Sequence, residues 1–472
     1  MKLNEDKKIG IIMKKHFMLS KKHDMDMCSG PLFRKILIFA LPIIAMNILQ
    51  LMFNAADMIV VGRFSGKEAL AAVGATGALI NLIVNTFMGL SVGTAVVVAQ
   101  DYGAGNVSGL SHSVHTSITI SIIGGVVVMV LGLLFCKPLL ILMGTPDDIL
   151  DLSVLYMTIY FLGVPATMIY NFGAAILRAV GDSRRPMYYL VISGVVNVIL
   201  NLFFVTALHM SVDGVAWATI ISQFLSMALI MICLARSNII GIRFIPRKMR
   251  IDRQKLNQIV RIGLPAGLQS ALFSISNVMI QSAVNSFGSV MVAASSAASN
   301  VEGFVGTTMN AYYNAAISFT GQNMGAKKYD RIDTIAKVCT LLIFATWIIM
   351  SGAILLFGKS LLYMYTSDPE VMDLGMLRLK VSMVAYFTCG VMNVFPGLTR
   401  GMGYSVLPMI CTLIGACLMR IVWLQTVFAW YPTVVMLFAC YPVTWGLAGL
   451  GQVGIFFYAR HRIRKNSALA AG

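Results

Sequence analysis

Asp57 is an acidic residue within an apolar stretch of the chain. Asn47, Gln50, Asn54 and Asp57 are spaced i, i+3, i+7 and i+10, so they share one face of a helix that turns by about 100° per residue. Low-dielectric surroundings disfavour the charged form of a carboxyl group, which can then take up and release a proton. The stripe therefore predicts the wall of an ion or substrate cavity. The alternative is that Asp57 only hydrogen-bonds a neighbouring helix.

Glu302 is the second acid within an apolar stretch, since the other acids can be assigned to tails, loops or helix ends. It could line the substrate cavity, where it would attract a cationic substrate or relay protons. It could equally pair with Arg378, Lys380 or Arg420. Three such positive charges against one acid would make this region net basic. An anionic or zwitterionic substrate is therefore a second hypothesis beside that of an organic cation, and Arg420 is a candidate cavity residue.

Neutral polar and aromatic side chains supply further candidates for a substrate cavity. Asn277 and Gln281 belong to an uncharged polar stripe that begins at Ser270, and Tyr312 belongs to an aromatic cluster. The chain also contains 32 methionines, whose flexible side chains suit a pocket that accepts many ligands. Aromatic residues and methionines can equally be core or lipid-facing filler.

The composition indicates a membrane protein. Of its 472 residues, 58% are hydrophobic and only 12% are charged, and the mean hydropathy is +0.81, which is unlike an ordinary soluble domain. Apolar runs long enough to cross about 30 Å of hydrocarbon as helices recur along the chain. They predict twelve spans, over residues 35–61, 70–101, 112–135, 152–177, 187–208, 213–236, 256–286, 289–321, 334–357, 372–399, 407–430 and 433–459.

The second half of the chain repeats the first. Arg178-x-x-Gly181-x-Ser183 returns as Arg400-x-x-Gly403-x-Ser405, and Gln100-x-x-Gly103-Ala104 returns as Gln322-x-x-Gly325-Ala326, both shifted by 222 residues. Six spans per copy is an even number, so both copies enter the membrane from the same side. We predict an all-α membrane protein with twelve transmembrane helices in two six-helix lobes, related by a pseudo-twofold axis along the membrane normal. A duplicated chain of this kind usually binds its substrate between the copies.

The distribution of charge predicts the domain boundaries and the orientation. We expect a basic tail over 1–32, an N-terminal lobe over 33–236, a linker over 237–255, a C-terminal lobe over 256–460 and a second tail over 461–472. If both termini are cytoplasmic, 28 of the 36 lysines and arginines lie on the cytoplasmic side, as the positive-inside rule requires. The net charge of +17 then reflects topology and contact with anionic membrane lipids, with no nucleic-acid partner.

The chain resembles the multidrug and toxic compound extrusion (MATE) family from about residue 33 to 460. The matching segments are Leu41-Pro42, Asp57-Met-Ile-Val-Val-Gly62, Gly214-Val-Ala-x-Ala218-Thr219-x-x-Ser222-Gln223, and the two duplicated motifs. In the DinF-like branch, the resemblance implies a cation site built from four positions, which are here Asp57, Asn197, Asn201 and Thr219.

Asn201 departs from the pattern of that branch, because it occupies the position of a second carboxylate. A hard cation would be held less well by the remaining oxygens, so the resemblance favours a proton over sodium, with transient sodium binding at Asp57 left open. Taken singly, Asn197 and Asn201 could instead make only interhelical hydrogen bonds.

These patterns predict a cation-coupled antiporter that exports amphipathic organic compounds by alternating access between two lobes. We expect coupling to H⁺ or Na⁺, no cofactor, no resident metal, organic cations as substrates, a monomer, and a multi-pass location in the cell membrane. An enzyme is disfavoured because the chain has no HExxH or GxSxG motif. The alternative function is a flippase for lipid-linked oligosaccharides of the same superfamily.

Overall fold

The computed structural model describes residues 25–239 and 241–469, and this part of the chain is helical, without strands. The first half contains α2 (Leu32–Val60), η1 (Val61–Ser65), α3 (Gly66–Gly103), α4 (Val107–Leu142), α5 (Asp147–Ala179), α6 (Arg184–Leu202), η2 (Phe203–Ala207) and α7 (Val212–Ala235). The linker contains η3 (Pro246–Lys248). The second half contains α8 (Arg253–Asn285), α9 (Ser289–Gly325), α10 (Tyr329–Thr346), η4 (Trp347–Ser351), α11 (Gly352–Tyr363), α12 (Pro369–Val384), α13 (Tyr386–Gly401), α14 (Val406–Thr412), η5 (Leu413–Leu418), α15 (Met419–Gln425), α16 (Val427–Trp430) and α17 (Val434–Leu469).

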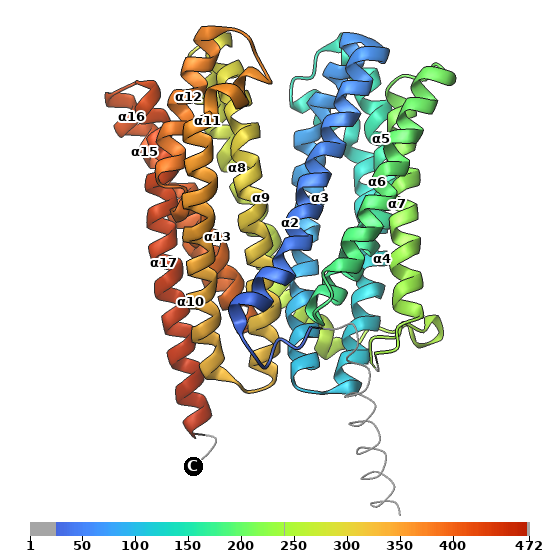
Figure 1. Ribbon diagram of the computed structural model, residues 1–472. Helices are drawn as coiled ribbons and strands as arrows, with labels where there is room; N and C mark the ends of the chain where they lie inside the picture. Colours follow the sequence, from blue (N-terminus) through green and yellow to red (C-terminus); the bar gives the residue numbers. More distant parts are fainter. Residues whose placement is uncertain (1–24, 240, 470–472) are drawn as a thin grey trace, which may run out of the picture.

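The two halves form two bundles that stand side by side (Figure 1). In the described part of the chain, nine helices are long and apolar enough to cross a membrane, and the pair α12 and α13, bent by 52°, makes a tenth. The helices α3 and α9, of 38 and 37 residues, complete the two sets of six. The predicted fold of twelve helices in two lobes is therefore confirmed.

Several helices run past the predicted ends of their spans. α4 begins at Val107, five residues early, because the side chain of Asn106 caps it by accepting a hydrogen bond from the amide of Gly109 at 2.9 Å. α17 continues to Leu469, through much of the predicted tail over 461–472, where Arg464 pairs with Asp330 at 2.7 Å on α10. Hydropathy finds only the part of a helix that lies in hydrocarbon. Residues 1–24 of the other predicted tail lie outside the described residues.

Helix α2 belongs to both halves. Its first turns, including Leu32, Phe39 and Ile43, are buried in the main apolar core of the second half, and the ring of Phe39 meets that of Phe319 on α9 edge to face at 5.7 Å. Its later turns pack against α6. The N-terminal lobe predicted from residue 33 therefore begins with a helix that packs against both halves.

The duplicated glutamines make equivalent hydrogen bonds between the halves. Gln100 on α3 donates from Nε2 to the carbonyl of Gly401 at 2.9 Å, and Gln322 on α9 donates to the carbonyl of Ala179 at 2.7 Å. Residues 179 and 401 are themselves 222 positions apart, so the two bonds are related by the repeat. Each copy thus binds the other through the same motif.

The duplicated glycines allow this close approach. A Cβ atom on Gly103 would lie 2.0 Å from the carbonyl oxygen of Gln322, and one on Gly325 would lie 2.0 Å from that of Gln100. Any side chain would force the helices apart. We call Gln100, Gly103, Gln322 and Gly325 the Gln–Gly clasp.

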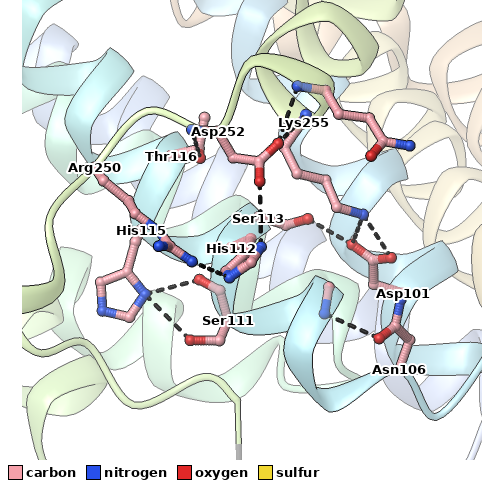
Figure 2. A network of polar contacts seen from close by, with 12 residues as sticks. Asp101, Asn106, Ser111, His112, Ser113, His115, Thr116, Arg250, Asp252 and Lys255 are labelled. Atoms are coloured by element: carbon pink, nitrogen blue, oxygen red, sulfur yellow. Dashed lines mark hydrogen bonds and ion pairs between the residues drawn. The ribbon is translucent and has the colours of Figure 1, made fainter.

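The end of the linker is bonded to side chains of α3 and α4 (Figure 2). Lys255 pairs with Asp101 of α3 at 2.6 Å, with both side chains largely buried. The amide of Asp252 donates to Thr116 of α4 at 3.1 Å, and its carboxylate caps α8 by accepting from the amides of Lys255 and Gln254. The Lys255 amide is the main cause that holds the pKa of Asp252 below its usual range. The start of α8 is therefore anchored to the first half.

We expect a Gly103→Ala substitution to loosen the clasp, because the new methyl group and the Gln322 carbonyl cannot occupy the same space. Hydrogen–deuterium exchange should quicken at the clasp ends of α3 and α9. Gly77→Ala on the same helix is the control, since nothing lies within 4 Å of a Cβ atom there. Equal exchange in the two variants would contradict the role given to Gly103.

Candidate functional site

A cavity of about 240 Å³ in the first half contains the Asp57 side chain. Its walls come from α2, α5, α6 and α7. They are mainly polar and aromatic, with Asp57 and Arg178 as the two charged lining residues. The lining comprises Met46, Gln50, Phe53, Asn54, Asp57, Tyr156, Tyr160, Thr167, Tyr170, Asn171, Arg178, Leu190, Ser193, Gly194, Asn197, Thr219, Ser222, Gln223 and Ser226.

The four residues implied as a cation site are linked to one another. Asn201 donates from Nδ2 to Asp57 Oδ1, and the same Nδ2 lies 3.4 Å from Asn197 Oδ1. Asn197 in turn donates to Thr219 Oγ1 at 3.4 Å. Asn197 and Asn201 are one turn apart on α6, which places both between α2 and α7. The structure therefore brings the four side chains together.

Two buried side-chain oxygens near these four residues lack hydrogen-bond partners in the described structure. They are Oδ1 of Asn201 and Oε1 of Gln223. A buried acceptor without a donor carries a desolvation cost, and both oxygens could be satisfied by a bound proton donor or by a small cation. The described residues contain no cluster of three or more metal-ligating His, Cys, Asp or Glu side chains. The site thus offers one carboxylate and several neutral oxygens.

The side chains of the polar stripe on α2 lie in two different surroundings. Gln50, Asn54 and Asp57 line the cavity. Asn47 does not line it, because its side chain donates to the carbonyl of Thr307 on α9 at 3.0 Å. Asn47, expected as a cavity residue, thus lies outside the lining of both described cavities, and it bonds the first half to the second.

Sequence analysis missed the aromatic wall of this cavity. Tyr156 and Tyr160 of α5 lie one turn apart with ring centroids 6.3 Å from each other, and both line the cavity. Their i, i+4 spacing was the available signal. Arg178 was known only as part of the repeat, although it lines this cavity while its counterpart Arg400 lines the next one.

A second cavity of about 440 Å³ lies between the halves, bounded by α3, α8, α9, α13 and α14. We call it the central cavity. Arg400 is its one charged lining residue among those described, and neither aspartate nor glutamate is present. The lining comprises Met88, Gly89, Ser91, Val92, Ala266, Gln269, Ser270, Phe273, Ser274, Asn310, Tyr313, Asn314, Met392, Asn393, Pro396, Arg400 and Thr412.

Glu302 is paired inside the second half and does not line the central cavity. Its carboxylate accepts from Arg378, at 2.9 Å from Nη2 and 3.3 Å from Nε, and from the hydroxyl of Ser382 at 2.7 Å. Arg378 is buried, whereas Lys380 is exposed. The contacts agree with the pairing interpretation of Glu302, since a buried guanidinium occupies both carboxylate oxygens. Glu302 is not among the residues that line either described cavity.

Tyr312 also lies away from the central cavity. Its side chain is only 3% exposed, and its hydroxyl hydrogen-bonds Thr346 at 2.8 Å. Tyr313, the next residue, faces the cavity instead. The sequence identified the cluster but not the residue, because neighbours on a helix point about 100° apart.

The stripe on α8 reaches the central cavity at a different point from the predicted one. Ser270 and Ser274 line it, whereas Asn277 and Gln281, further along the helix, are exposed and lie outside this lining. Asn277 accepts from Arg420 at 2.7 Å. Asn277, Gln281 and Arg420, which the sequence suggests as cavity residues, are thus not among the residues that line the central cavity.

The MatE family model matches residues 42–203 and again 265–424, once in each half. The chain belongs to the MATE family. Members of this family are multi-pass membrane transporters and not enzymes. Family membership therefore indicates a membrane transporter.

Curated relatives and solved structures agree with this assignment. A probable multidrug resistance protein of Bacillus subtilis, YoeA, is 27% identical over 387 residues, which cover 80% of this chain and 83% of that protein. An FAD transporter of Shewanella oneidensis is 25% identical over 376 residues, covering 78% and 82%. A crystal structure of MATE in complex with MaL6 matches with a TM-score of 0.85 at 23% identity, covering 94% of this chain and 99% of that one. This likeness supports the MATE fold of twelve helices in two lobes.

We expect Glu302→Ala to lower the free energy of unfolding by about 3–5 kcal/mol, because it leaves Arg378 buried without its counter-ion. Unfolding in mixed micelles of increasing SDS content would measure this. Asp373→Ala is the control, since the Asp373–Lys359 pair is more than two-thirds exposed and should contribute at most about 1 kcal/mol. A similar loss in both variants would argue against a special role for the buried pair.

Proposed function

We propose that this protein exports amphipathic small molecules in exchange for an inward-moving cation, and that Asp57 couples the two movements. The observation that carries the proposal is the enclosure of Asp57 in a cavity of the first half, apart from the larger central cavity. One cavity could then hold the coupling ion while the other holds the substrate. A drug-resistance relative at 27% identity supports small-molecule export.

The coupling ion we propose is the proton. Asp57 is the one carboxylate of its cavity, and neutral amides with a single carboxylate make a weak site for a hard cation. Protonation would remove the cost of a charge held in low dielectric. Asn201 suits both states, because its amide group can donate to a carboxylate and, after a flip, can accept from a protonated carboxyl group.

Helix α2 is the element that could carry this change to the other half. It bears Asp57 near its end and Asn47 in its middle, where Asn47 is bonded to α9. Pro42 interrupts its hydrogen-bond ladder and permits bending. A change in the Asp57–Asn201 contact would therefore alter how α2 sits between the halves. Movement of the halves about the Gln–Gly clasp would give alternating access.

We also propose a location in the cell membrane with both termini in the cytoplasm. The clasp and the basic linker lie at the same end of the bundle, as Asp101 and Lys255 show, and cytoplasmic ends carry the excess of basic residues. The central cavity is then closed toward the cytoplasm by the clasp. We do not propose the flippase alternative, because such a groove is expected to carry several basic residues, whereas Arg400 is the one charged side chain among the described residues that line this cavity.

An Asp57→Asn variant should fold but lose proton-driven transport, because an amide cannot titrate. Dye movement in proteoliposomes with an imposed pH gradient would fall to the level of protein-free vesicles. Asp148→Asn, an exposed acid in the same half, is the control and should keep wild-type rates. Undiminished transport by Asp57→Asn would refute the coupling role.

An Asn201→Asp variant should gain a dependence on sodium, because a second carboxylate beside Asp57 strengthens a site for a hard cation. The same vesicles, with sodium gradients compared against potassium gradients of equal size, would measure this. If transport by the variant responded alike to both cations, the proposed ion site would be misplaced.

A further inference from the structure

The buried charges of the second half indicate which substrates the central cavity accepts. Resting on the transport function proposed above, we infer that this cavity selects anionic or zwitterionic compounds in preference to organic cations. The inference departs from the substrate class expected for the family resemblance. It depends on three buried arginines and one acid.

Arg400 presents a positive charge that no carboxylate of the described residues neutralises. Its side chain is 4% exposed, and its guanidinium donates to Tyr313 Oη at 2.6 Å, to Gln269 Oε1 at 2.6 Å and to Ser405 Oγ at 3.3 Å. All three acceptors are uncharged. These bonds hold the guanidinium in position and leave its charge in place.

Arg400 also retains capacity to bind a ligand. A guanidinium carries five N–H donors, and the bonds to described residues use three of them. Carboxylate, sulfonate and phosphate groups are the acceptors that match the remaining donors in charge and planarity. The hydroxyls of Ser270 and Ser274, which also line the cavity, donate within their own helix.

Arg420 adds a second positive charge behind the cavity wall. It is 1% exposed, and its Nε and Nη2 atoms have no hydrogen-bond partner among the described residues. Its other nitrogen donates only to the neutral side chains of Asn277 and Ser276. Its guanidinium lies over the ring of Phe273 at 4.6 Å, and Phe273 lines the central cavity.

The third buried arginine, Arg378, is neutralised by Glu302. Arg400 and Arg420 therefore give the region around the cavity an excess of two positive charges. In a poorly screened interior such charges attract anions and repel cations over several ångströms. An organic cation entering this cavity would meet no carboxylate among its lining residues.

Two dyes with one ring system test the inference. Carboxyfluorescein is an anion and rhodamine 123 is a cation, and both are xanthenes. We expect the purified protein in non-ionic detergent to bind carboxyfluorescein at least about tenfold more tightly, as measured by fluorescence anisotropy, since a charge-assisted hydrogen bond is worth about that factor. Equal binding, or tighter binding of rhodamine 123, overturns the inference.

Gln269→Glu isolates the charge of Arg400. The glutamate keeps the shape of the side chain and its bond to Arg400 while it neutralises the guanidinium, so the preference for the anion should fall about tenfold. Arg400→Gln should give the same loss and serves as the second variant if Gln269→Glu proves unstable. Lys380→Gln removes an exposed charge of the same half and should leave the ratio unchanged. An unaltered ratio in the folded cavity variants overturns the inference.

A transport assay distinguishes a failure of the inferred selectivity from a failure of the proposed transport function. If carboxyfluorescein binds preferentially but a pH gradient moves neither dye across vesicles, the proposed proton coupling fails and the selectivity stands. If a pH gradient drives rhodamine 123 and the protein binds carboxyfluorescein no better, the transport function stands and the selectivity is overturned.

Discussion

A charged group inside a membrane must find a partner or be enclosed by the protein, and this constraint arranges the interior of both halves. Asp57 accepts a hydrogen bond from the Asn201 amide in a small cavity, and Glu302 is paired with Arg378. Arg400 is held by three neutral side chains at the boundary between the halves. The three groups therefore differ in their partners: a neutral amide for Asp57, a guanidinium for Glu302, and neutral acceptors for Arg400.

The distribution of these groups gives the halves different tasks in spite of their common origin. With the shift of 223 residues that relates Pro42 to Pro265, Asp57 corresponds to Ile280. With the shift of 222, Asn197, Asn201 and Thr219 correspond to Met419, Trp423 and Tyr441. Each of these four polar residues thus has an apolar or aromatic counterpart in the second half. Among the described residues, the polar group around Asp57 thus has no equivalent at the matching positions of the second half, which contributes most of the central cavity.

The sequence predicted what depends on composition and on long regular patterns. The twelve spans, the duplication and the grouping of Asp57 with Asn197, Asn201 and Thr219 came from hydropathy, from the internal repeat and from the family resemblance. The direction of single side chains at helix crossings could not be predicted. Asn47 and Tyr312 share helices with true cavity residues but point elsewhere, because rotation and crossing angle are set by packing against neighbouring helices. The partner of Glu302 was open among three basic residues, and only tertiary structure selects Arg378.

The two equivalent hydrogen bonds of the Gln–Gly clasp have a consequence for how the halves are held together. Equivalent residues that bind each other reciprocally are the hallmark of an isologous contact, the kind formed by two identical subunits about a twofold axis. Here the contact is intramolecular, and the anchored linker keeps its two sides together at every protein concentration. A substitution in one copy of the motif is also not doubled by symmetry, as it would be in a homodimer. One copy of the motif can therefore acquire a substitution while the other copy keeps its hydrogen bond and the alignment of the two halves.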